Sequence, residues 1–217
     1  MATVLAMVLL PDTCAGQKTT YAGFLGGIST LSADGRTTVA AQTVATSSYK
    51  PENGPAIDVF GGVHWNDFLS FQADYLWDRN ALTLDASRAN ANVGVAFYEQ
   101  EYRSSQHVVI GNALLYFRAR SSRVRPFLAA GTGVVHLAAD PRASGAAQGS
   151  TPPAGFRSTK AVLHVWVGID LRVRRGWAFR YSFTETVSSN PISRELDPPG
   201  QRKLANFRNL FGLVKEF

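Results

Sequence analysis

The sequence has almost no cysteine and no long apolar run. Its one cysteine, Cys14, cannot form an internal disulfide, so such cross-links play no part in the fold. No apolar stretch reaches the roughly 18 residues that a membrane-spanning helix needs, which excludes an integral helical membrane protein. The mean hydropathy is -0.06 and 45% of the residues are hydrophobic. This balance is typical of soluble proteins, but also of a transmembrane β-barrel, whose polar interior positions offset its apolar exterior.

Acidic side chains are the scarcer charged class. The chain has 22 Lys and Arg against 16 Asp and Glu, a formal net charge of +6. Arginine is dense in residues 118–125 and 172–175. Both clusters fall at turns between apolar segments, with no basic helix, so we expect no binding of nucleic acid. Anionic lipid head groups are the partner that this charge favours.

The N-terminus has part of an export signal. Residues 4–10 are apolar, and Thr13 and Ala15 are small residues at the spacing that a signal peptidase reads. The positively charged leading region is missing, as if the start were truncated. We expect residues 1–15, with Cys14, to be a signal peptide and residues 16–217 to form one domain. The alternative is that the apolar run is an ordinary buried first strand.

The dominant pattern along the chain is an alternation of apolar and polar residues with a period of two, which indicates β-strands. It is clearest in residues 69–77, where Leu69, Phe71, Tyr75 and Trp77 share one face. Eight such segments are expected, approximately at residues 19–31, 56–65, 69–78, 102–118, 126–138, 163–172, 177–184 and 204–217. The connections alternate between tight turns and long polar loops at residues 32–54, 86–95, 140–157 and 188–203.

The last strand has two distinct faces. Its apolar face carries Phe207, Phe211, Leu213 and Phe217, and its other face carries Asn206, Arg208, Gly212, Val214 and Glu216. In a membrane barrel the first face meets lipid and the second lines the lumen. Asn209 and Lys215 depart from this pattern because they fall on the apolar face. Lys215 lies near the strand end, where it could reach the head groups, whereas Asn209 has no explanation in the sequence.

Asn206, Arg208, Gly212 and Phe217 match the closing strand of the OmpA-like family of small outer-membrane β-barrels, which this sequence resembles. The resemblance implies an all-β fold: an eight-stranded antiparallel up-and-down transmembrane β-barrel with long outer loops and short periplasmic turns. It further implies a bacterial outer-membrane location, contact with outer-membrane lipids and lipopolysaccharide, and recognition by the barrel-assembly machinery. We expect a monomer without cofactor or catalytic role, serving envelope integrity, adhesion to an unidentified extracellular ligand, or a small pore.

The lumen of so narrow a barrel is filled by side chains, and buried charges must pair there. The charges expected in this network are Asp58, Asp74, Asp78, Arg118, Asp170, Arg172, Arg180, Arg208 and Glu216. Such a network is either a structural plug or a gated ion path whose pairs exchange partners. The sequence leaves both open.

Three other interpretations compete with this one. Ser105 and His107, with Glu99 or Glu101, could form an acyl-hydrolase set acting on lipid A. However, the alternation of the strand places Ser105 and His107 on the same face as Val109 and Leu115, which is the lipid face. A soluble lipocalin-like carrier would turn the apolar faces inward around a hydrophobic ligand. Aromatic residues near the turns favour the membrane barrel instead.

A metal site is the third. His64, His136 and His164 lie on the polar faces of three strands, but nothing fixes them at one height, so we expect none.

Overall fold

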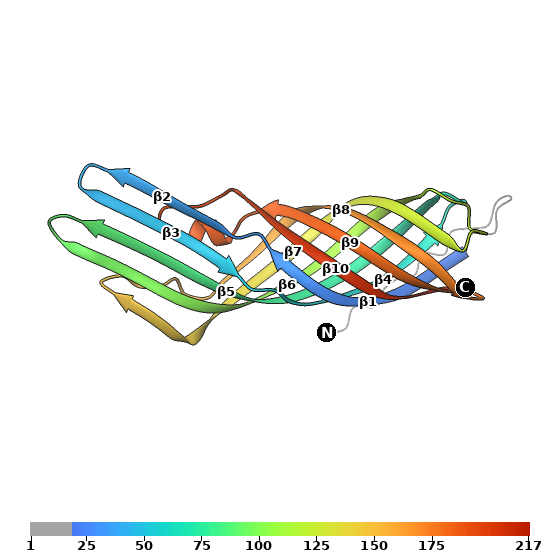
Figure 1. Ribbon diagram of the computed structural model, residues 1–217, viewed down its shortest axis with the longest axis horizontal. Helices are drawn as coiled ribbons and strands as arrows, with labels where there is room; N and C mark the ends of the chain where they lie inside the picture. Colours follow the sequence, from blue (N-terminus) through green and yellow to red (C-terminus); the bar gives the residue numbers. More distant parts are fainter. Residues whose placement is uncertain (1–18) are drawn as a thin grey trace.

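A computed structural model describes residues 19–217; the expected signal peptide at residues 1–15, with Cys14, lies outside them. The described part consists almost entirely of antiparallel strands (Figure 1). Their bounds are β1 Thr19–Leu31, β2 Asp34–Ala40, β3 Thr43–Pro51, β4 Gly54–His64, β5 Leu69–Asn90, β6 Gly94–Tyr116, β7 Val124–Gln148, β8 Phe156–Arg174, β9 Trp177–Ser189 and β10 Lys203–Glu216, with one 3-10 turn, η1 Ile192–Glu195. Within this part, no helix is long and apolar enough to cross a membrane.

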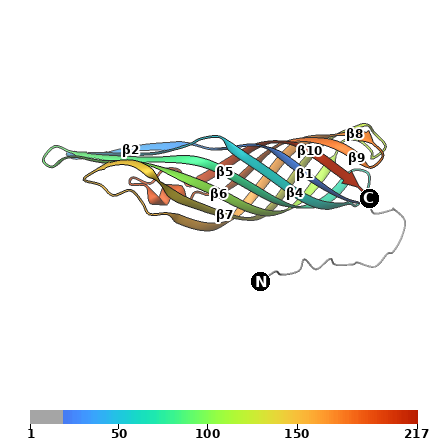
Figure 2. The same ribbon diagram turned by 90° about the horizontal axis from the view of Figure 1, so that it is seen from below.

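Eight of the strands close into a ring. The order is β5-β4-β1-β10-β9-β8-β7-β6, and pairing of β6 with β5 completes the circle. The first and last strands are paired along nearly their whole length, from Tyr21 with Glu216 to Leu31 with Asn206. Figure 2 shows the ring strands tilted against the long axis, as closure of a barrel requires. The predicted eight-stranded up-and-down barrel is therefore confirmed.

Two of the expected outer loops are instead β-hairpins. Residues 34–51 form β2 and β3, and β5 and β6 continue into the predicted loop at residues 86–95, where Asn90 pairs with Gly94. β3 pairs with residues 82–90 of β5, so the two hairpins form one continuous sheet, here called the outer sheet. It projects from the ring at the end opposite the C-terminus (Figure 1). The threonine-rich composition of residues 37–46 suits a strand, a signal that the loop prediction overlooked.

The tips of the two hairpins are tied together. Asn92 Nδ2 donates to Gln42 Oε1 at 2.6 Å, and Asn90 Nδ2 donates to Thr43 Oγ1 at 2.9 Å. The backbone N–H of Ala91 also donates to the Gln42 carbonyl at 3.2 Å. The outer sheet is thus fixed at its far end as well as at the ring.

The alternation predicted from the sequence sets the two surfaces of the ring. Phe71 and Tyr75 are 45% and 43% exposed on the outside, whereas Asp74 between them is 3% exposed inside. Exposed aromatic residues surround the end with the short turns: Trp65, Phe68, Phe117, Trp177 and Phe217. An apolar outer band edged by aromatic residues is the surface that a lipid bilayer requires. The soluble-carrier interpretation is wrong, because the apolar faces point outward.

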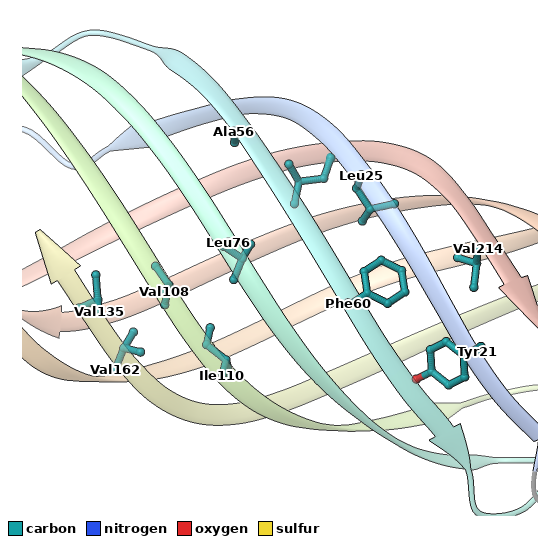
Figure 3. Packing of buried hydrophobic residues seen from close by; sticks show 11 residues of the cluster. Tyr21, Leu25, Ala56, Phe60, Leu76, Val108, Ile110, Val135, Val162 and Val214 are labelled. Atoms are coloured by element: carbon teal, nitrogen blue, oxygen red, sulfur yellow. The ribbon is translucent and has the colours of Figure 1, made fainter. Parts of the chain in front are cut away.

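The lumen is more apolar than predicted. Tyr21, Leu25, Phe60 and Leu76 point into it and pack together with buried residues from several other strands (Figure 3). A second apolar cluster near the outer end includes Ile192 and Leu196 of the β9–β10 connection. The barrel interior therefore has an apolar core in which the charged groups form separate clusters.

Candidate functional site

One charged cluster in the lumen centres on Arg180 of β9. Its Nε donates to Asp170 Oδ1 at 2.6 Å and its Nη2 to Asp170 Oδ2 at 2.8 Å. Nη1 donates to Gln72 at 3.0 Å and Nη2 to the Tyr116 hydroxyl at 2.9 Å. The guanidinium also lies 4.9 Å from the ring centre of Phe127. Arg180 is fully buried, and its donors are used by partners from three further strands.

Two amides connect Asp74 to this cluster. Gln72 Nε2 and Asn112 Nδ2 each donate to one Asp74 carboxylate oxygen at 2.5 Å. Asn112 Oδ1 in turn lies 3.0 Å from His164 Nδ1. Gln72, Asn112 and Tyr116 were not singled out as network members from the sequence, although each lies on the inward face of a predicted strand.

A second cluster centres on Arg208 of β10, a position of the closing-strand motif. Its Nε donates to Asp78 Oδ1 at 2.7 Å and its Nη2 to Asp78 Oδ2 at 2.5 Å, and both side chains are fully buried. Thr186 accepts from Arg208 Nη1 at 2.9 Å, and Asn206 donates to Asp78 at 3.1 Å. Asn206 and Arg208, two residues apart, therefore hold the same carboxylate.

Asp58 is buried at 3% exposure and interacts electrostatically with both Arg180 and Arg208. Its Oδ1 has no hydrogen-bond partner among the described residues. Of the nine charges expected in the lumen, Asp58, Asp74, Asp78, Asp170, Arg180 and Arg208 are buried there.

The other three charges lie at the periplasmic end, the end with the short turns. Glu216 and Arg172 are partly exposed and lie 3.8 Å apart. The placement of Arg118 in the lumen is wrong: β6 ends at Tyr116, and Arg118 is exposed in the turn that follows. The period of two cannot locate a strand end, because an arginine after the last strand residue still has the inward parity.

The closing-strand residues lie as the alternation predicts. Phe211, Leu213 and Phe217 are exposed on the outside, and Phe207 stacks on Phe183 at 6.2 Å. Gly212 is half-buried against β1.

The two departures from the pattern find partners on β9. Asn209 Oδ1 accepts from the Tyr181 hydroxyl at 3.1 Å, and Lys215 Nζ lies 5.2 Å from the ring centre of Trp177. Both of these polar side chains on the lipid face therefore contact an aromatic neighbour.

The histidines and the Ser105–His107 pair are not assembled into a site. His107 Nδ1 lies 2.7 Å from the Tyr75 hydroxyl, and His136 Nδ1 lies 2.9 Å from Thr159. His64 contacts Ser70 at 2.6 Å. Among residues 19–217, no group of three His, Cys, Asp or Glu side chains is placed to hold a metal ion.

Tyr116→Phe tests the Arg180 cluster. The hydroxyl accepts from Arg180 and donates to Asp170 at 3.0 Å, so its loss leaves two buried groups short of a partner. We expect the free energy of unfolding to fall by about 1–3 kcal/mol, measured by urea titration in lipid vesicles. An unchanged unfolding midpoint would show that the cluster does not depend on this hydroxyl.

The outer end holds a pocket that the sequence did not reveal. The β9–β10 connection, residues 190–202, folds over this end as a cap, with Ile192 fully buried. Asn190 organises the cap: its Oδ1 accepts from the backbone N–H groups of Ile192 and Ser193, and its Nδ2 donates to the Tyr49 hydroxyl at 2.9 Å. Burial raises the pKa of Tyr49, against the opposing effect of its hydrogen bonds, so the hydroxyl stays protonated.

The ion pair of Arg88 with Asp197 joins the cap to the outer sheet, as do two further hydrogen bonds. The Ser47 hydroxyl donates to the Pro198 carbonyl, and the Gln201 N–H donates to Asp34. Between cap and β2 lies a cavity of about 590 Å³, here called the outer pocket. Its lining is Arg36, Thr38, Ser189, Asn190, Ser193, Arg194, Pro198, Pro199, Gly200 and Arg202.

The outer pocket is strongly cationic. Arg36, Arg194 and Arg202 line it, and no acidic residue does. None of the three guanidinium groups has a hydrogen bond or ion pair to another described residue. Arginine is the side chain best suited to bind phosphate or sulfate through paired N–H donors, and hydroxyls and amides complete the lining. Such a pocket can hold a small, multiply charged anion.

Comparison with known proteins gives both a family and similar folds. Residues 1–201 match the family model described as outer membrane protein beta-barrel domain. The comparison with curated proteins gives no match. Neisserial surface protein A is a similar solved structure, with 14% identity and a TM-score of 0.54 over 91% of this chain and 97% of that one. Ail of Yersinia pestis, in complex with the heparin analogue sucrose octasulfate, has 11% identity and a TM-score of 0.47 over 91% and 99%.

The expectation that this chain is not an enzyme requires correction. The outer membrane protease OmpT of Escherichia coli is also among the similar structures, with 9% identity and a TM-score of 0.46 over 93% of this chain and 97% of that one. A protease is thus among the proteins to which this chain is similar, so the expected absence of a catalytic role is withdrawn.

Proposed function

Because the chain belongs to the outer membrane protein β-barrel family and lies in the bacterial outer membrane, we propose that it is a surface-binding protein whose outer end takes an anionic ligand. The resemblance to small OmpA-like barrels is confirmed at the level of family and fold. The ring is the membrane anchor. The outer pocket, with Arg36, Arg194 and Arg202 around one cavity, is the observation that carries the proposal.

The length of the strands supports a role outside the membrane. A strand of about 9–11 residues crosses a bilayer at the usual tilt. β5 has 22 residues and β6 has 23, and they pair from Leu69 with Leu115 to Asn90 with Gly94. The excess length builds the outer sheet and supports one wall of the outer pocket. Binding residues on a rigid scaffold lose little conformational freedom when a ligand arrives.

The filling of the lumen favours surface binding over a pore. Trp166, Arg180, Arg208 and Phe127 are buried inside the ring, and the cap covers its outer end. The two arginines are held by bidentate pairs with Asp170 and Asp78. Opening a path would require these buried pairs to separate in a low-dielectric interior, which is costly. The ion pairs therefore suit a structural plug better than a gate.

The ligand class follows from the lining. Three guanidinium groups favour phosphate or sulfate esters, and the serine, threonine and asparagine side chains suit sugar hydroxyls. A cavity of this size accepts a group on the scale of one or two sugar rings. We therefore expect a saccharide bearing several sulfate or phosphate groups.

We expect the triple variant Arg36→Gln/Arg194→Gln/Arg202→Gln to bind such ligands at least tenfold more weakly, because each charge-assisted contact contributes about 1.5–3 kcal/mol. The measurement is the dissociation constant of detergent-solubilised protein for heparin oligosaccharide and for the phosphorylated core of lipopolysaccharide. The two probes distinguish a host source from a bacterial one.

The matched control is Lys50→Gln/Arg142→Gln/Arg157→Gln. It removes the same charge from the outer end, but at basic residues already paired with Asp85, Glu101 and Asp140 and outside the pocket lining. If both variants lost the same amount of affinity, the overall charge of the outer end would account for the binding. That result would contradict binding in a defined pocket. If the wild-type protein bound neither probe and instead conducted ions in planar bilayers, the pore function would replace the proposal.

A further inference from the structure

The periplasmic end carries an excess of positive charge. The turns between β6 and β7 and between β8 and β9, with the adjoining strand ends, carry a dense set of basic residues. These are Arg118, Arg120, Arg123, Arg125, Arg172, Arg174 and Arg175, and Lys215 of β10 lies opposite Trp177 beside the second turn. Near them at this end lie Asp67 and Glu216. The outer-end function proposed above makes no use of this charge.

Glu216 organises part of this set. Its carboxylate lies 3.4 Å from His64, 3.8 Å from Arg125 and 3.8 Å from Arg172. Arg125 is further held by the Asp67 carbonyl at 3.0 Å and by the Tyr116 ring, 3.8 Å from its guanidinium carbon. These contacts hold the side chains of Glu216, Arg125 and Arg172 in place at the periplasmic opening of the ring.

Arg123, Arg174 and Arg175 line a defined hollow together with Arg172. A cavity of about 570 Å³, here called the periplasmic cradle, is lined by Ser121, Arg123, Arg172, Val173, Arg174, Arg175, Gly176 and Glu216. Arg123, Arg174 and Arg175 are exposed, and their side chains have no hydrogen bond or ion pair to another described residue.

Backbone bonds hold the cradle in shape. Arg172 N–H donates to the Arg123 carbonyl at 2.8 Å, which joins the two basic turns. Glu216 N–H donates to the Gly176 carbonyl at 2.8 Å, which joins β10 to the second turn. The three guanidinium groups therefore extend from a fixed backbone frame.

The surroundings of the cradle identify the membrane as the source of its ligand. Val173, in its lining, is 70% exposed, and Phe117, Trp177 and Phe217 of the aromatic band lie at the same end. Exposed aromatic residues of a barrel lie at the level of the lipid head groups. A ligand at this depth meets guanidinium groups and apolar side chains together. A phospholipid that carries net negative charge offers the matching pair, a phosphate next to acyl chains.

We propose that the periplasmic cradle binds the phosphate head group of an anionic phospholipid of the inner leaflet, through Arg123, Arg174 and Arg175. The site would give the periplasmic end of the barrel a preferred lipid neighbour. It is independent of the outer pocket, because the two sites lie at opposite ends of the ring.

The test uses the full chain in phosphatidylcholine nanodiscs with a small fraction of spin-labelled phosphatidylglycerol. The fraction of immobilised label is compared with that of spin-labelled phosphatidylcholine. We expect the wild-type protein to prefer phosphatidylglycerol, with a preference that weakens as salt is added. Arg123→Gln/Arg174→Gln/Arg175→Gln should reduce the relative association constant about tenfold.

The control is the outer-pocket variant Arg36→Gln/Arg194→Gln/Arg202→Gln, which makes the same charge change at the other end and should keep the preference. A closed barrel gives a band shift between unheated and boiled samples on a detergent gel, and both variants must show this shift. If the triple variant of the cradle does not show it, the single variant Arg175→Gln is tested instead. No preference in the wild-type protein, or equal losses in both variants, would overturn the proposal. So would capture of soluble polyglutamate at the cradle without a lipid preference, since that points to a periplasmic acidic peptide.

Discussion

Replacing Arg208 with leucine is expected to lower the free energy of unfolding by about 3–5 kcal/mol, because it leaves a fully buried carboxylate without its cation. Asp78 receives two guanidinium N–H groups, at 2.7 and 2.5 Å, and neither side chain reaches solvent. The amide of Asn206 would remain, but one neutral donor does not offset a buried negative charge. The measurement is urea-induced unfolding in lipid vesicles, followed by tryptophan fluorescence.

Two further variants isolate the pair. Arg79→Leu removes the neighbouring exposed arginine of β5 and should change stability by less than about 1 kcal/mol. Asp78→Leu/Arg208→Leu removes both charges and should recover much of the loss, since a buried ion pair can be replaced by apolar side chains at small cost. If Arg208→Leu were no more harmful than Arg79→Leu, the pair would not support the fold.

Gly212→Ala is expected to disrupt the seam at which the barrel closes. A Cβ atom at this position would lie 1.9 Å from the Phe24 carbonyl oxygen and 2.7 Å from the Leu25 Cα, both backbone atoms of β1. The two strands must then separate, which breaks ladder bonds between β1 and β10. Overpacking of this kind costs about 1–3 kcal/mol where side chains can adjust, and we expect the upper end or more where backbone must move.

The readout is the fraction of protein that refolds into detergent micelles, seen as the heat-dependent band shift on a gel. Purified protein is refolded so that the result depends on this chain and the detergent alone. Gly111→Ala is the matched control, because a Cβ there meets nothing within 4 Å. Equal refolding of the two variants would contradict the close approach of β1 and β10.

The closing strand illustrates how far local pattern determines structure. Phe211 and Leu213 point outward and Asn206 and Arg208 inward because successive side chains leave a strand on opposite faces. Parity needs no knowledge of neighbouring strands, so the sequence determined the eight ring strands, the lipid-facing surface and most of the buried charges. The same argument failed at Arg118, since parity continues past the residue at which pairing stops.

Which residues meet across the barrel was decided only by the tertiary structure. The outer sheet depends on pairing of residues 43–51 with residues 82–90, and no local pattern specifies that partner. Bonding of Asn209 to Tyr181 and of Arg208 to Asp78 depends on strand register and barrel closure in the same way.

The outer pocket is the clearest case. Arg36 comes from the first hairpin, whereas Arg194 and Arg202 come from the β9–β10 connection, far along the chain. They meet because Ile192 and Leu196 are buried in the second apolar cluster, near the outer end of the lumen. This packing holds the cap against β2 and β3. The sequence by itself determined an outer-membrane barrel, because a strand's two faces are set by local geometry. Its candidate binding sites were set only by long-range packing, which brings distant arginines to one place.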